Sequence, residues 1–258
     1  MKLSLVFAFL LTAALYASAG FGGGSTYTAL LAVSGASFYV IPIVSLLCNI
    51  CVVTGNSIRY FKAKLISLSD IWPLFVLSIP AAFLGGRLNV PEALFIGLLC
   101  VALFIAGGRM VLSQTEAHDA SQGLRNNPVI CALIGGAIGF YSGIVGIGGG
   151  IFLAPVLYKL RWGRAQEIAA ACSMFILVNS MSGLGGQIMK ALELDHLPEI
   201  LPYTPLIIAV IVGGTIGNII SIRFLKPKYL RRITGMLILA VAIRLVIKWV
   251  GLMAIYMA

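Results

Sequence analysis

Apolar residues occur along this chain in long runs that only short polar or basic stretches interrupt. The runs cover residues 3–19, 26–33, 38–58, 71–86, 93–112, 129–147, 151–158, 165–189, 200–222 and 233–256. Most of them approach the roughly 20 residues that a helix needs to cross a bilayer core. A transmembrane barrel would instead show segments of about ten residues with alternating hydrophobicity. The pattern therefore predicts an all-α, polytopic membrane protein.

Two glycine motifs interrupt the apolar runs at matching places. The first covers residues 20–24 (GFGGG), and the second, 126 residues later, covers residues 146–150 (GIGGG). Each glycine disfavours a helix by roughly 1 kcal/mol relative to alanine. Non-helical backbone is tolerated inside a bilayer only where protein surrounds it or where it lines a cavity. Breaks at corresponding positions of two halves indicate the binding site of a transporter.

The motifs divide the chain into two similar halves. We expect a first transmembrane repeat at residues 1–116, a polar linker at 117–127 and a second repeat at 128–258. Residues 3–19 and 25–34 would form a hairpin, and the second limb, about 15 Å of helix, is too short to cross the bilayer. Whether the glycines are re-entrant tips or breaks within helices stays open. About eight membrane-spanning helices are expected besides these half-helices.

The positions of the 18 Lys and Arg residues predict how the halves face. Two halves with the same orientation would place nine on each side of the membrane. Inverted halves place thirteen on one side and leave Lys2, Arg87, Lys190, Arg244 and Lys248 on the other. The positive-inside rule favours the uneven distribution. We therefore predict inverted repeats, with both termini and the acidic loop at residues 193–199 outside.

The start of the chain has a second interpretation. The apolar run after Lys2, which ends in Ala17-Ser18-Ala19, has the form of a cleavable signal peptide. Residues 3–24, however, match residues 129–150 in pattern, glycines included. We therefore expect residues 3–19 to form the first helix of a repeat.

The glycine motifs also predict the chemistry of a site. A half-helix that begins at either triplet directs its free N–H groups and positive dipole end towards the break, where they attract an anion. The candidate substrate-binding residues are Gly22, Gly23, Gly24, Ser25, Asn49, Gly148, Gly149, Gly150, Cys172 and Ser173. Asn49 and Ser173 stand at matching positions, and either substrate contact or hydrogen bonding between helices explains them.

The other small and polar residues of the runs have structural interpretations. Close helix packing explains Gly85, Gly86, Gly213, Gly214 and Gly217. Hydrogen bonding between helices explains Thr54, Asn56, Ser57, Asn179, Ser180, Ser182 and Gln187. We expect Arg59 and Arg87 to snorkel to an interface. No acid lies plainly at a helix centre, so the sequence shows no obvious proton relay.

The sequence also limits the function classes. The net charge of +10 does not indicate nucleic-acid binding, because the basic residues lie in short loops. Charged residues make up 10% of the chain, against about 25% in a soluble domain, so no domain outside the membrane is expected. The chain has no ATP-binding phosphate loop or hydrolase motif, and we expect no enzymatic activity, cofactor or metal. An anion channel and an accessory membrane protein remain alternatives to a transporter.

The duplicated G-x-G-G-G motif, followed by an apolar half-helix and A-x-x-[CT]-[SN], resembles the sulfite exporter TauE/SafE family of membrane transporters. The second half has the proline of that half-helix, Pro155, and the sequence AAACS at residues 169–173. In the first half, Ala29 replaces the proline and Cys48-Asn49 replaces the usual Thr-Ser pair. The resemblance covers residues 3 to about 250.

The resemblance implies a secondary transporter that moves sulfite or an organosulfonate across the cytoplasmic membrane, often outward. Thiosulfate or a small carboxylate is the alternative substrate. The coupling ion, proton or sodium, stays open, and so does a homodimer.

Overall fold

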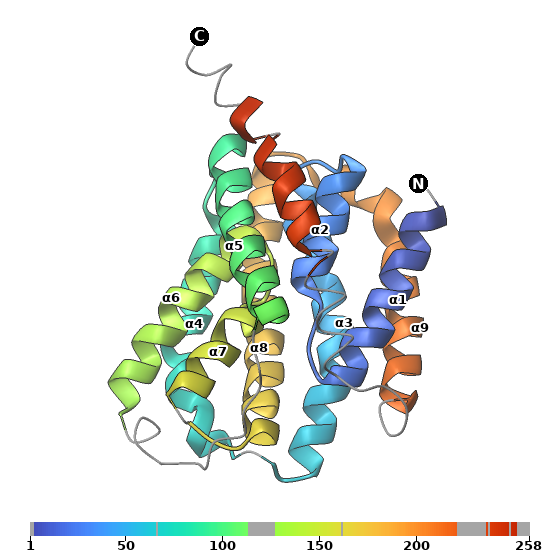
Figure 1. Ribbon diagram of the computed structural model, residues 1–258. Helices are drawn as coiled ribbons and strands as arrows, with labels where there is room; N and C mark the ends of the chain where they lie inside the picture. The colour runs from blue at the N-terminus through green and yellow to red at the C-terminus, as the bar shows by residue number, and fades with distance from the viewer. Residues whose placement is uncertain are drawn as a thin grey trace.

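The computed structural model describes residues 3–65, 67–112, 127–160, 162–220, 236, 238–247 and 249–251. This part of the chain is helical throughout, apart from short connections (Figure 1). The elements are α1 (Leu3–Ala19), α2 (Gly24–Ser34), α3 (Val40–Lys62), α4 (Leu68–Arg87), α5 (Glu92–Leu112), α6 (Pro128–Val145), α7 (Gly150–Lys159), α8 (Ala165–Glu193), the 3₁₀ helix η1 (Leu197–Tyr203) and α9 (Thr204–Ile220). Residues 238–247 and 249–251 are also helical. Of the expected linker, residues 117–126 lie outside the described residues.

Six of the described helices are long and apolar enough to cross a membrane. They are Val40–Lys62, Ser69–Arg87, Glu92–Arg109, Pro128–Val145, Gln166–Glu193 and Glu199–Ile219. Large apolar side chains on their outer faces are exposed, for example Trp72, Leu133 and Ile219 at 54%, 60% and 70%. A surface of this kind requires lipid rather than water around it. The predicted class of polytopic membrane protein is therefore confirmed, whereas the number of eight spans stays a prediction.

Each glycine motif separates two helices that lie against each other. Helix α1 ends at Ala19 and α2 begins at Gly24, and α6 ends at Val145 and α7 begins at Gly150. The predicted starts of both half-helices are thus confirmed. Helices α2 and α7 have 11 and 10 residues, and each packs against the helix before it. The glycines therefore form the tips of hairpins (Figure 1).

The centre of the molecule is the antiparallel pair of α3 and α8. Ser57 meets Ser173 near one end of the contact, and Leu46 meets Gly183 towards the other. Helix α4 packs against α6 and α8, and α9 packs against α1 and α3. In Figure 1, α1 and α6 lie on opposite sides of the central pair. This arrangement brings both hairpins against the two central helices, because α2 packs on α3 and α7 packs on α8.

Glycines let the outer helices approach their neighbours backbone to backbone. A Cβ atom on Gly135, Gly139 or Gly143 of α6 would collide with a carbonyl oxygen of α4. In the same way, Gly213 and Gly217 of α9 face the carbonyl oxygens of Leu10 and Ala14 in α1. Gly85 and Gly86 of α4 face Phe140 and Gly183. The expectation that Gly85, Gly86, Gly213 and Gly217 are packing residues is confirmed, since small residues permit such close contacts in membranes.

We expect Gly139→Val to destabilise the α4–α6 contact by about 1–3 kcal/mol, as overpacking does. The added side chain meets the backbone of Ser78, which has no rotamer to give way. The matched control is Gly108→Val in α5, where an added Cβ has nothing within 4 Å. The measurement is the midpoint of thermal unfolding in detergent. Equal losses for both variants would show that the close approach of α4 and α6 is not the cause of the loss.

Candidate functional site

Glycine is required where each half-helix begins. The N-cap residues Gly23 and Gly149 have φ of 85° and 82°, a left-handed conformation that strains any residue with a Cβ. Neither helix has a side-chain cap. The third and fourth amides of each helix donate to the N-cap carbonyl. The first two amides, at residues 24–25 and 150–151, have no intrahelical acceptor and point into the break.

Asn49 of α3 lies between the two glycine motifs. Its Nδ2 donates to the carbonyl oxygen of Ile147 at 3.0 Å. A side chain on Gly22, Gly24 or Gly148 would collide with the same amide. Asn49 is fully buried, and its Oδ1 has no hydrogen-bond partner. The asparagine therefore joins the first motif to the second.

A network of buried hydroxyl groups fixes the start of α2. Thr28 and Ser45 both donate to the carbonyl oxygen of Gly24, at 2.7 Å and 3.1 Å, and their hydroxyl groups lie 2.9 Å apart. The Tyr16 hydroxyl lies 2.9 Å from Thr26 Oγ1. These bonds tie the tip of the first hairpin to α1 and α3.

The second motif is surrounded by polar atoms that lack a partner. Gly148 packs against Ser180 of α8, and Gly149 packs against Ser142 of α6. Both hydroxyl groups are fully buried, and neither has a hydrogen-bond partner. Buried polar groups are normally hydrogen-bonded. Together with the free Oδ1 of Asn49, they indicate a place where a bound ligand or water completes the hydrogen bonding.

The ten predicted site residues are all buried, but they do not all meet. Ser173 Oγ lies 3.1 Å from Ser57 Oγ, so it joins α8 to α3 rather than contacting a motif. The carbonyl group of Cys172 lies beside Gly150, while the residue belongs to an apolar cluster with Leu153 and Phe175. Ser25, buried in the first turn of α2, offers a backbone amide to the break.

The positive potential at the motifs comes from the backbone. None of the candidate residues is an Asp, Glu, His, Lys or Arg, and Lys190 is the only buried charged residue among those described. No group of three or more metal-ligating side chains occurs in the part of the chain that the structure covers. A helix N-terminus carries roughly half a positive charge. Two such ends beside one buried amide favour an anionic ligand.

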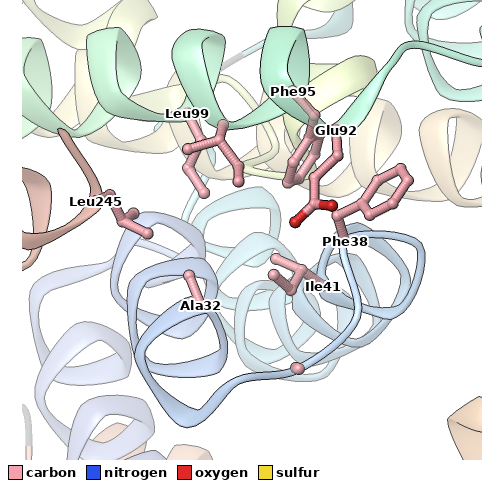
Figure 2. Close-up of a pocket in the computed structure, with 9 residues that line it drawn as sticks. Ala32, Phe38, Ile41, Glu92, Phe95, Leu99 and Leu245 are labelled. Atoms are coloured by element: carbon pink, nitrogen blue, oxygen red, sulfur yellow. The ribbon is translucent and has the colours of Figure 1, made fainter. Parts of the chain in front are cut away.

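A small pocket elsewhere has the opposite character. It lies between the end of α2, the start of α3, α5 and the helix at residues 238–247, and Phe38, Ile41, Phe95 and Leu99 line it. Figure 2 shows the carboxylate of Glu92 pointing into it. A carboxylate among apolar side chains repels an anion, so this pocket does not fit the chemistry of the motifs.

Two residues near the motifs were not among the candidates. Tyr16 packs against Gly23, and Ser142 packs against Gly149. They are 126 residues apart, the spacing of the motifs themselves. Each is a hydroxyl residue in an apolar run, one helical turn before its motif. That spacing was the signal in the sequence that would have identified them.

The chain is similar to several curated membrane proteins. It is 34% identical over 247 residues to the "Probable membrane transporter protein y4hK" of Sinorhizobium fredii, which covers 94% of this chain and 97% of that protein. A "Probable membrane transporter protein" of Xylella fastidiosa is 30% identical over 185 residues, 67% of each chain. The "Probable membrane transporter protein MamO" of Paramagnetospirillum magneticum is 24% identical and matches over 39% of its length. No solved structure matches the chain.

These relatives are named as transporters, not as enzymes, and the helices described above form a multi-pass membrane protein. The model of one protein family, "Sulfite exporter TauE/SafE", matches residues 5–245. The chain therefore belongs to the sulfite exporter TauE/SafE family.

Proposed function

We propose that this protein is a secondary transporter that exports a small sulfur-containing anion, sulfite or an organosulfonate, across the cytoplasmic membrane. The substrate binds between the two glycine motifs and Asn49. The observation that carries the proposal is the contact of Asn49 with both motifs, which places two helix N-termini around one buried amide. The name of the family supports the class of substrate.

The site suits a small oxyanion. Backbone N–H groups at residues 24–25 and 150–151 supply donors without the desolvation of a full positive charge. Ser142 and Ser180 add hydroxyl groups that have no partner within the protein, and Asn49 Nδ2 has a second N–H besides the one that it donates to Ile147. An oxyanion accepts several hydrogen bonds at once, and a hydroxyl group donates to it as readily as an amide. Ser25 completes the proposed surroundings of the substrate, whereas Ser173 bonds to Ser57 and Cys172 packs in an apolar cluster beside them.

We further propose that the two halves, residues 1–116 and 128–258, are inverted repeats. The pairing of helices supports this, because α4 packs on α6 and α8 as α9 packs on α1 and α3. In Figure 1, α1 starts at the upper end of the molecule and α6 starts at the lower end. Opposite directions of corresponding helices are what an inverted repeat requires, and transporters with such repeats bind substrate at the interface of the halves.

Burial of all ten site residues fits a closed state of a carrier. A substrate would then reach the motifs only when the helices on one side separate, with a proton or sodium ion as the coupling ion. The main alternative is an anion channel, which would need a continuous open path. Thiosulfate and small carboxylates are the alternative substrates, and an accessory protein without transport activity is the third reading.

The direct test is the flux of radiolabelled sulfite into proteoliposomes, with and without a pH gradient. We expect saturable uptake that unlabelled sulfite on the far side accelerates, because a carrier returns faster when loaded. Sulfoacetate, taurine, thiosulfate and sulfate serve as unlabelled competitors that identify the substrate class. Single-channel currents without such acceleration would favour the channel. The absence of flux with every anion would remove the proposal.

We expect Asn49→Asp to lower sulfite flux by at least about ten-fold, because a carboxylate about 4 Å from an anion costs several kcal/mol in a partly buried site. The matched control is Asn218→Asp in α9, whose side-chain amide lies beside Gly55 of α3 and not at a glycine motif. Both variants are measured in the same flux assay. Unchanged flux in Asn49→Asp would exclude this amide from the binding site.

A further inference from the structure

Two polar series run along the central helices with the same spacing. In each series a residue beside Gly148 is followed by an amide seven positions later and a cation ten positions later. The series are Asn49, Asn56 and Arg59 on α3, and Ser180, Gln187 and Lys190 on α8. Seven residues make almost two full turns, so each amide lies on the face of the helix that contacts the motif.

The two cations lie at opposite ends of the central pair. Helices α3 and α8 are antiparallel, as the contacts of Ser57 with Ser173 and of Leu46 with Gly183 show. Ten helical residues cover about 15 Å, so Arg59 and Lys190 lie roughly 30 Å apart along the pair. That separation is close to the thickness of a bilayer core. The glycine motifs lie midway between them.

The end with Arg59 has an unused donor beside a cation. Nη2 of Arg59 donates to Asn56 Oδ1 at 3.1 Å, and the guanidinium lies 5.6 Å from the ring centroid of Tyr60. Asn56 is fully buried, and its Nδ2 has no hydrogen-bond partner. Leaving a buried donor unpaired is unfavourable. An oxyanion at this position would accept from the amide and be attracted by the guanidinium.

The end with Lys190 has a buried cation without a carboxylate. Lys190 is 7% exposed, and its Nζ donates to the carbonyl oxygen of Leu88 over a long 3.5 Å. Glu193, one turn further, pairs with Arg87 at 3.0 Å instead. Within the described part of the chain, Lys190 is in no salt bridge. A snorkelling lysine would extend its ammonium into water, and an unpaired buried ammonium is unfavourable.

The amide of the α8 series is also held in place. Gln187 is fully buried, and its Nε2 donates to the carbonyl oxygens of Gly143 and Ile144 at 2.8 Å and 3.3 Å. These bonds tie α8 to the end of α6, directly before the second glycine motif. The turn that carries Lys190 is thereby fixed relative to the motif.

We propose that Arg59 with Asn56, and Lys190 on the turn after Gln187, form two outer docking sites for the transported oxyanion. One site lies at each end of the α3–α8 pair, and the substrate passes between them through the glycine motifs. Arg59 belongs to the end where we expect the basic, cytoplasmic loops, so it receives the anion and Lys190 releases it. The inference rests on the proposed function, since both sites serve the same substrate.

The test is the Km for sulfite, measured separately from each side in proteoliposomes of uniform orientation. We expect Arg59→Gln to raise the Km about ten-fold from its own side, since the variant loses a charge-assisted hydrogen bond to the anion. We expect Lys190→Gln to raise the Km for sulfite measured from the opposite side. Arg59→Lys and Lys190→Arg retain most of the affinity because they keep the charge. The control at the Lys190 end is Arg87→Gln, which removes a half-exposed cation and leaves both Km values unchanged.

A second measurement separates this inference from the proposed function. Stabilisation of the detergent-solubilised protein by sulfite is compared between the wild type and the Arg59→Gln, Lys190→Gln double variant. Normal flux with unchanged Km values in all variants would overturn the docking sites alone. Sulfite stabilisation that the double variant loses, without any flux in the wild type, would overturn the transport proposal and support the sites. The absence of both flux and stabilisation would overturn the transport proposal and the docking sites together.

Discussion

The structure depends on one constraint, which is that backbone polar groups inside a bilayer must find partners within the protein. Continuous helices meet that demand by themselves, but the two glycine motifs interrupt the helices and leave backbone groups without intrahelical partners. Each break leaves helix N-terminal amides in the apolar interior, and the surrounding helices enclose them. Asn49, Thr28 and Ser45 satisfy the carbonyl groups of the breaks. In the proposed function, the N–H groups at residues 24–25 and 150–151 are the donors to an anionic ligand.

The second requirement is close approach. A helix N-terminus creates a useful potential only within about one turn, so the two hairpins must come within contact distance of the same amide. Glycines on α4, α6 and α9 remove the side chains that would hold the outer helices away. Helices α4 and α9 can therefore pack closely against α6 and α1, the first helices of the two hairpins, and against α8 and α3. Helix packing and the electrostatics of the motifs therefore depend on each other. A bulky residue at a packing glycine or at a motif glycine would separate the two motifs.

Few charged residues lie in the interior of the part of the chain that the structure describes. The described interior holds one buried charged residue, Lys190, and it lies near a helix end rather than at the motifs. The partial charge of a helix end attracts an anion less strongly than a full cation does. In the docking sites proposed above, the full charges at the two ends of the α3–α8 pair attract the anion before it reaches the motifs. The distribution of charge thus matches a path with weak binding at its centre.

The sequence by itself determined the class of protein, the positions of both glycine breaks and the starts of α2 and α7. Long apolar runs and consecutive glycines act locally, through the length of a helix and the cost of glycine within it. It also identified Asn49 as a polar residue at a matching position, without showing what it touches. Only the tertiary structure decided that Asn49 meets Ile147, 98 residues away, that Ser173 pairs with Ser57 instead of a motif, and that Ser142 and Ser180 lie beside the glycines. Those contacts depend on the register of antiparallel helices, and a shift of two residues turns a side chain to the opposite face.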